Sequence, residues 1–100
     1  MSGDDFWFSE IGIPWCREED YNTLLSISED AHDMPRTWKR FTELVEEVEQ
    51  EWQTQGRTVR RVYINPYAFP DWCKSKGYRV NAHARHRFAF EAVTKTHRGE

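Results

Sequence analysis

The spacing of hydrophobic positions predicts one long helix in the middle of the chain. Between residues 37 and 55 the large apolar side chains recur at intervals of three and four, which places them on one stripe of a helix. These side chains are Trp38, Phe41, Val45, Val48 and Trp52. Thr37 is a natural N-cap, and Gly56 supplies the left-handed residue that commonly ends a helix. We therefore expect an amphipathic helix over residues 37–55.

Two shorter segments have the composition of β-strands. Residues 21–28 (YNTLLSIS) and residues 58–64 (TVRRVYI) hold β-branched and apolar side chains between polar clusters. Because the long helix lies between them, we expect a βαβ unit with two parallel strands. Residues 6–13 show the alternation of a further short strand, which Pro14 and the acidic run 18–20 are expected to end.

The last third of the chain predicts two shorter helices. Pro70 suits the first position of a helix over residues 70–76, and Gly77 ends it. Asn81 then caps a final helix over residues 82–96. The fold class is therefore α+β, a small sheet with a parallel βαβ unit followed by two C-terminal helices. The side chains expected in the core are Trp38, Phe41, Val45, Val48, Trp52, Val62, Ile64, Phe69, Trp72, Phe88 and Ala92.

The length and composition favour one soluble domain. A chain of 100 residues forms one domain with one core, and the polar residues 1–5 are expected to fray. The N-terminal sequence has neither the basic nor the apolar region of a signal peptide, and no segment reaches the ~18 apolar residues of a membrane span. We expect a cytoplasmic protein with no membrane association, in which Cys16 and Cys73 stay reduced.

Charge is divided unevenly along the chain. Residues 1–55 carry fourteen acidic and four basic side chains, a net charge of −10, whereas residues 56–100 carry three acidic and ten basic side chains, a net charge of +7. The overall charge of −3 conceals this difference. Such asymmetry bears on partners and association and not on the fold. It is compatible with head-to-tail association of identical chains as well as with binding to another molecule.

The long helix carries an acidic run that suggests a protein-binding surface. Its glutamates between Phe41 and Gln55 are not interrupted by any lysine or arginine. The residues proposed to contact a partner are Glu43, Glu46, Glu47 and Glu51. The simpler interpretation is a solvated helix face, because charge runs commonly serve solubility. The functional interpretation is a non-enzymatic interaction module, an inhibitor or adaptor, whose acidic helix face meets a partner protein with a basic surface.

The basic C-terminal half suggests an alternative, which is nucleic-acid binding. The order short helix, turn and helix resembles a helix-turn-helix, and cationic side chains suit phosphate contacts. The residues assigned to this alternative are Arg79, His83, Arg87 and Lys95. The acidity of the whole chain argues against it, because nucleic-acid-binding domains are usually basic.

Arg85 is expected to form a structural ion pair. On a helical wheel at ~100° per residue, Arg85 falls within the apolar arc of the last helix. A guanidinium buried there needs an acidic partner. We assign this role to Asp71, with Glu29 and Asp30 as the other candidates.

The sequence gives little support for catalysis or for metal binding. Cys73, His83 and His86, with Cys16 as a fourth group, lack the paired spacing of structural zinc sites. Cys73 next to Lys74, with Lys76 nearby, has the surroundings of an activated thiol, but no orienting group is visible. We expect no cofactor, no bound metal and no enzyme activity. As a whole the chain is similar to small bacterial or phage proteins, on no motif specific enough to transfer a function.

Overall fold

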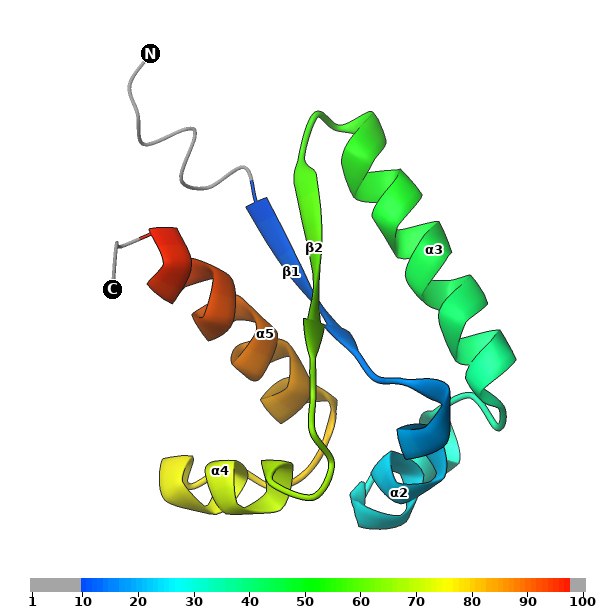
Figure 1. Ribbon diagram of the computed structural model, residues 1–100, viewed down its shortest axis with the longest axis vertical. Helices are drawn as coiled ribbons and strands as arrows, with labels where there is room; N and C mark the ends of the chain where they lie inside the picture. Colours follow the sequence, from blue (N-terminus) through cyan, green and yellow to red (C-terminus); the bar gives the residue numbers. More distant parts are fainter. Residues whose placement is uncertain (1–9, 98–100) are drawn as a thin grey trace.

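The computed structural model describes residues 10–97 as a small parallel sheet surrounded by helices (Figure 1). In chain order the elements are β1 (Glu10–Trp15), α2 (Glu18–Ile27), the 3-10 turn η1 (Ala31–Asp33), α3 (Trp38–Thr54), β2 (Thr58–Tyr63), α4 (Phe69–Lys76) and α5 (Ala82–His97). The fold class is the one that the sequence predicted, with a parallel βαβ unit followed by two C-terminal helices. The expectation of fraying at residues 1–5 lies outside the described residues.

The first strand lies elsewhere than predicted. Residues 21–28 do not form a strand, because residues 18–27 form the helix α2. Three acidic residues in its first turn complement the positive end of the helix dipole, although their run had been interpreted as a break. Tyr21, Leu24 and Ser28 are buried at a spacing of three and four, which is helical. The parallel partner of β2 is instead β1, which overlaps the weaker prediction for residues 6–13 and continues through Pro14.

Within residues 10–97 the sheet has two parallel strands, and no other described strand pairs with the outer edge of β1. In the register Gly12 pairs with Arg60 and Pro14 with Val62. The N–H of Ile64 donates to the carbonyl of Trp15 at 2.8 Å, so the odd residues of β1 direct their backbone groups toward β2. Gly12 and Pro14 consequently direct theirs away from β2. Proline has no N–H to donate, which is why it is tolerated at this edge.

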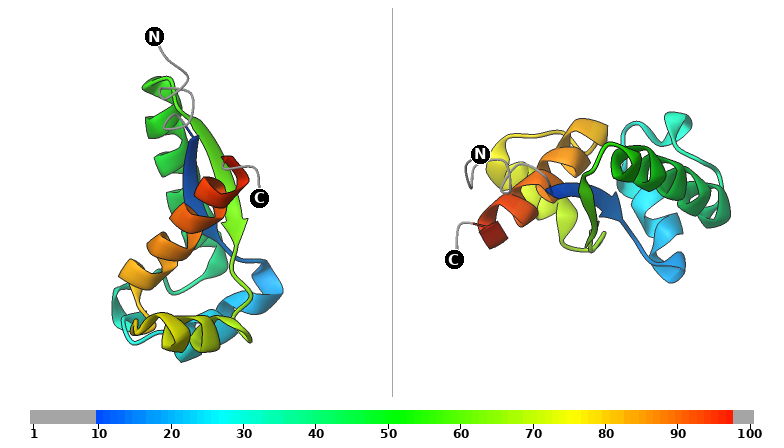
Figure 2. Two further views of the ribbon diagram at one scale, coloured as in Figure 1. Left: turned by 90° about the vertical axis from the view of Figure 1, so that its left-hand side faces the viewer. Right: turned by 90° about the horizontal axis from the view of Figure 1, so that it is seen from above.

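The two longest helices cover opposite faces of the sheet. Figure 1 shows α5 on one side of the strands and α3 on the other, and the view from above in Figure 2 agrees. On the α5 side, Val62 packs with the buried residues Ala89 and Val93. Gly12 makes this close approach possible, because a Cβ atom at that position would lie 2.5 Å from the carbonyl oxygen of Ala89.

The helix α3 has the ends that the sequence predicted, but it is only partly buried. The Thr37 hydroxyl accepts a hydrogen bond from the N–H of Arg40 at 3.1 Å, and Gly56 has a φ of 82°. Trp15 contacts the rings of Trp38 and Phe41 from the sheet. Val45 is the one buried residue of the helix.

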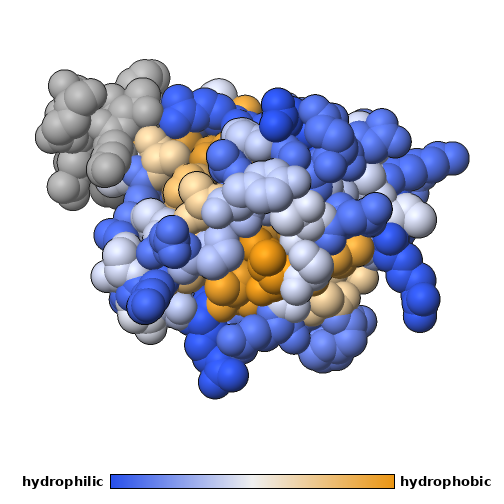
Figure 3. All heavy atoms as spheres, turned by 60° about the horizontal axis from the view of Figure 1, so that its bottom comes forward, coloured by the Kyte–Doolittle hydropathy of each residue, from blue (hydrophilic) through white to orange (hydrophobic). Residues whose placement is uncertain are grey.

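The core agrees with the prediction only in part. Val45, Val62, Ile64 and Phe69 are buried as expected, whereas Val48 is 39% exposed. The other expected core residues, Trp38, Phe41, Trp52, Trp72, Phe88 and Ala92, are half-buried. The main core lies at the end of the sheet where α2 and α4 meet, and it includes residues that were not predicted, Cys16, Tyr21, Leu24, Cys73 and Ala84. Figure 3 turns this end forward and shows hydrophobic atoms in the middle of the face inside a hydrophilic rim.

No helix within residues 10–97 combines the length and the apolar character that crossing a membrane would require.

Candidate protein-binding site

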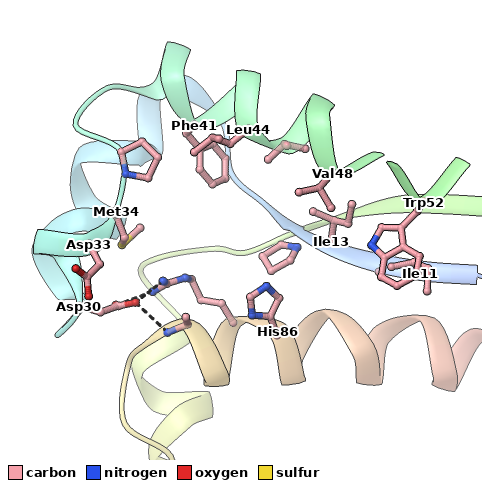
Figure 4. Close-up of a pocket in the computed structure, with 16 residues that line it drawn as sticks. Ile11, Ile13, Asp30, Asp33, Met34, Phe41, Leu44, Val48, Trp52 and His86 are labelled. Atoms are coloured by element: carbon pink, nitrogen blue, oxygen red, sulfur yellow. Dashed lines mark hydrogen bonds and ion pairs between the residues drawn. The ribbon is translucent and has the colours of Figure 1, made fainter. Parts of the chain in front are cut away.

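A groove with a volume of about 590 Å³ runs along the free edge of β1. Residues Ile11 to Pro14 form its floor, and α3 and the first turns of α5 form its two walls (Figure 4). Because side chains from both faces of β1 line it, the groove opens at the edge of the sheet and not on one face. It occupies the place where a third strand would lie in a larger sheet of the same kind.

The lining of this groove is mostly apolar. On the α3 wall, Leu44, Val48 and Trp52 face the sheet, and Figure 4 shows Trp52 beside Ile11 at one end. At the other end lie Met34 and the two acidic residues of the preceding loop, Asp30 and Asp33. The α5 wall contributes Ala82, Arg85 and His86. The apolar side chains of α3 are therefore incompletely buried because they line this groove.

Arg85 is buried as predicted, but its partner is Asp30 and not Asp71. The guanidinium donates to the two carboxylate oxygens of Asp30 at 3.1 and 2.7 Å and to the hydroxyl of Ser28 at 3.2 Å. These hydrogen bonds from Arg85 lower the pKa of Asp30. The N–H of Glu29 donates to the carbonyl of Val80 at 2.8 Å, which holds the loop of Asp30 at the start of α5. Asp71 is exposed in the first turn of α4.

The glutamates of α3 divide into two groups. At ~100° per residue, Glu47 and Glu51 stand on the groove side of the helix, next to Leu44 and Val48. Glu46 and Glu49 stand on the opposite side, toward β2. There Glu49 accepts two hydrogen bonds from Arg61, at 2.6 and 2.9 Å, which lower its pKa.

The four glutamates proposed for partner binding are only partly neutralised. Arg40 lies 3.2 Å from Glu43 and 3.7 Å from Glu47, so one cation serves two carboxylates. Within residues 10–97, neither Glu46 nor Glu51 makes an ion pair. The exposed side of α3 therefore keeps a net negative charge.

Much of the basic half pairs with the acidic half. Arg79 lies 2.6 Å from Glu29, and the pairs Arg60–Glu10, Arg61–Glu49 and Arg85–Asp30 also join the two halves of the chain. Arg87 lies 3.5 Å from Glu91, and the ring of His83 packs edge-on against Tyr78. The side chain of Lys95 lies outside the described part. Arg79, His83 and Arg87 all belong to the C-terminal helical region. Much of the positive charge of the basic half is already paired with carboxylates of the acidic half.

The cysteines have the surroundings of packed thiols. Burial, with a contribution from Asp20, raises the pKa of Cys16 to about 12. Burial also raises the pKa of Cys73, which is the opposite of the lowering by Lys74 or Lys76 that the sequence left open. Both thiols are free and buried. Among the described residues, no three His, Cys, Asp or Glu side chains gather in a way that could hold a metal ion.

One polar cluster was missed by the sequence reasoning. At the carboxyl ends of the strands, the Tyr63 hydroxyl donates to the buried carboxylate of Asp20 at 2.6 Å, and Arg17 donates to the same oxygen at 3.0 Å. The bond from Tyr63, followed by that from Arg17, lowers the pKa of Asp20, and the same bond raises the pKa of Tyr63. The cluster ties the start of α2 to the end of β2. Its only sequence signal was an acidic residue following an arginine, which is common.

Comparison with known proteins adds no further information, since no family model, curated protein or solved structure matches the chain.

Proposed function

We propose that this protein is a small non-enzymatic interaction module that binds a partner protein with a basic surface. The carrying observation is the incompletely neutralised charge of α3, where Glu43 and Glu47 share Arg40, Glu46 interacts with Arg61, and Glu51 makes no ion pair among the described residues. Complementary charge raises association rates and selects partners, even where each surface ion pair contributes little to affinity. The acidic side of α3 is therefore suited to choosing a basic partner.

The apolar groove supports the same conclusion. It adjoins the groove-side glutamates, so one contiguous surface combines apolar area with a charged rim. Productive protein interfaces commonly have this arrangement, an apolar centre surrounded by polar residues. Two buried free thiols also suit the reducing cytoplasm that we propose as the setting. The role we propose is that of an inhibitor or adaptor.

A charge-reversal experiment tests this function. The double variant Glu43→Lys/Glu47→Lys should lose, in an affinity purification from the native host, the partners that the unchanged protein retains. The matched control is Glu18→Lys/Glu19→Lys, which makes the same change of charge on the exposed start of α2. Circular dichroism establishes that both variants fold. Retention of every partner by the α3 variant, or equal loss in both variants, would contradict the proposal.

Nucleic-acid binding is the competing function, and the ion pairs of Arg79 and Arg87 weaken its support. It predicts binding that falls steeply as salt rises, because phosphate contacts release counterions. Fluorescence anisotropy with random DNA and RNA duplexes at low and physiological salt decides between the two. Salt-sensitive duplex binding that survives reversal of the α3 glutamates would favour the nucleic-acid function.

A further inference from the structure

We propose that the groove along β1 receives an extended segment of the partner, which adds to the sheet as a third strand. This inference rests on the proposed function and specifies how the partner binds. The occupant is a short segment with apolar side chains at alternate positions and lysine or arginine between or beside them. The backbone of β1, the two helical walls and the charge of the rim each support this choice.

The backbone of β1 offers hydrogen-bonding groups to such a segment. Because the odd residues of β1 serve β2, the N–H and C=O of Gly12 point into the groove, and so does the C=O of Pro14. A free strand edge is a ready template for pairing with another chain. With a rise of about 3.3 Å per residue, the six residues of β1 give an edge of about 20 Å. Peptides recognised by strand addition gain affinity from main-chain bonds of this kind.

The two walls would sort the side chains of an added strand. Successive residues of a strand point to opposite faces. One set of side chains would meet Leu44, Val48 and Trp52 on α3, and the other set would meet Ala82 and His86 on α5 (Figure 4). The α3 wall has only apolar groups at these positions, and Val48 is 39% exposed without an occupant. Alternate apolar residues in the partner would cover this exposed area. The lysine or arginine residues between them would project on the α5 side, so the glutamates of α3 would act on them through the net charge around the groove and not by direct pairing.

The charge of the rim favours a basic occupant. Asp30 and Asp33 line one end of the groove. Glu47 and Glu51 are not part of its lining, but on the helical wheel they stand next to Leu44 and Val48, which are. Of the nearby cations, Arg85 is held by Asp30, and Arg40 is shared between two glutamates. The exposed Arg36 stands beside the Asp33 end, and His86 lies on the α5 wall. At the Trp52 end the guanidinium of Arg57 lies 5.7 Å from the centre of the Trp52 ring, so cations stand near both ends of the groove. The excess negative charge therefore lies along the Glu47 and Glu51 side of α3.

Binding of a designed peptide to the full chain tests the proposal. The probe is a fluorescein-labelled peptide of about seven residues that alternates lysine and valine, enough to span β1. Its matched control replaces every lysine by glutamate. Two further probes carry N-methyl groups on the valines only or on the lysines only, which removes alternate N–H donors. Anisotropy gives the affinity, and amide hydrogen exchange by NMR reports on Gly12, with Ile13 as the internal reference.

The expected results separate strand addition from other modes of binding. The lysine peptide should bind and the glutamate peptide should not. One N-methylated peptide should bind at least about tenfold more weakly while the other keeps its affinity, because only one set of N–H groups can face β1. The Gly12 amide should exchange more slowly in the complex, whereas Ile13, already paired with β2, should not change. Glu47→Gln/Glu51→Gln should weaken binding about three- to tenfold, and Glu18→Gln/Glu19→Gln should leave it unchanged.

Other outcomes overturn the proposal and leave the proposed function to be judged on its own. If the lysine peptide binds but Gly12 exchange is unchanged, or if both N-methylated peptides behave alike, the partner docks without adding a strand. Absence of binding at low salt also overturns it. Protection of Gly12 in the free protein would mean that this chain or a second copy already fills the groove. In each case the partner purification with the α3 variants still decides whether the acidic face binds a protein.

Discussion

The two faces of the sheet are packed in different ways. On the α5 face the backbone of β1 touches the helix, Ala89 is fully buried, and the Arg85–Asp30 pair fixes the start of the helix. On the α3 face a longer and more amphipathic helix buries only Val45 and leaves a groove at the sheet edge. Because burial of apolar area stabilises a fold, the α5 face should contribute more to stability than the α3 face, which leaves apolar area exposed along the groove.

The largest effect is expected from breaking the anchor of α5. Arg85→Met leaves Asp30 without its cation, and because the Arg85 side chain is only 10% exposed, the free energy of unfolding should fall by about 3 kcal/mol. Urea denaturation followed by circular dichroism measures this. Arg79→Met is the matched control, because its pair with Glu29 also joins the two halves but is well exposed, and it should cost less than about 1 kcal/mol. Equal losses would show that burial does not distinguish the two pairs.

A substitution at the close approach of β1 and α5 should lower the free energy of unfolding by nearly as much. Gly12→Ala places a Cβ atom against the backbone of Ala89, which cannot move aside as a flexible side chain would. Unfolding should become easier by about 2 kcal/mol, the usual cost of overpacking, although alanine is normally preferred to glycine in a strand. Thermal unfolding gives the comparison.

The α3 face supplies the contrast for that measurement. Val48→Ala removes two methyl groups from a residue that is 39% exposed, and should cost less than about 1 kcal/mol. If Val48→Ala proved as damaging as Gly12→Ala, α3 would be as tightly packed as α5, and the comparison between the two faces would fail.

Acidification should lower the free energy of unfolding gradually and by a smaller amount, through carboxylates on both faces of the sheet. The pKa of Asp30 and that of Glu49 are lowered in the folded protein by Arg85 and Arg61 respectively. A lowered folded pKa means that the stabilisation is complete above the usual carboxyl range and is lost as pH falls through the folded value. Stability measured by urea denaturation should thus decline below about pH 4. Asp30→Asn should flatten part of this decline, and an unaltered slope would exclude Asp30 as a contributor.

Local signals determined which elements could be predicted. The helix α3 was found because its apolar stripe, its Thr37 cap and Gly56 agree, and α4 and α5 were found from Pro70, Gly77 and Asn81. Residues 21–28 were assigned to a strand because of their β-branched and apolar side chains. The helical spacing of Tyr21, Leu24 and Ser28 was overlooked, because only one of these three side chains is aliphatic. Sequence spacing also says nothing about which acid a folded loop brings to Arg85. The hydrogen bond from the N–H of Glu29 to the carbonyl of Val80 joins segments that are distant in the sequence, and it holds Asp30 close to Arg85.

The candidate site depended even more on tertiary structure. The glutamate run was visible in the sequence, but its division between a β2 side and a groove side follows from which face of α3 meets the sheet. The groove itself had no sequence signal, because it arises where β1 lacks a neighbour. Val48 was expected in the core on its helical position alone, and its exposure follows from that missing neighbour.

Pro14 has a consequence for the behaviour of the protein at high concentration. An unpaired strand edge can pair with further copies of the same chain and so lead to aggregation. Solubility then depends on interrupting the row of backbone N–H donors along that edge. The pyrrolidine ring at position 14, the fifth of the six residues of β1, does so near one end of this edge, because proline has no N–H to donate to a further copy.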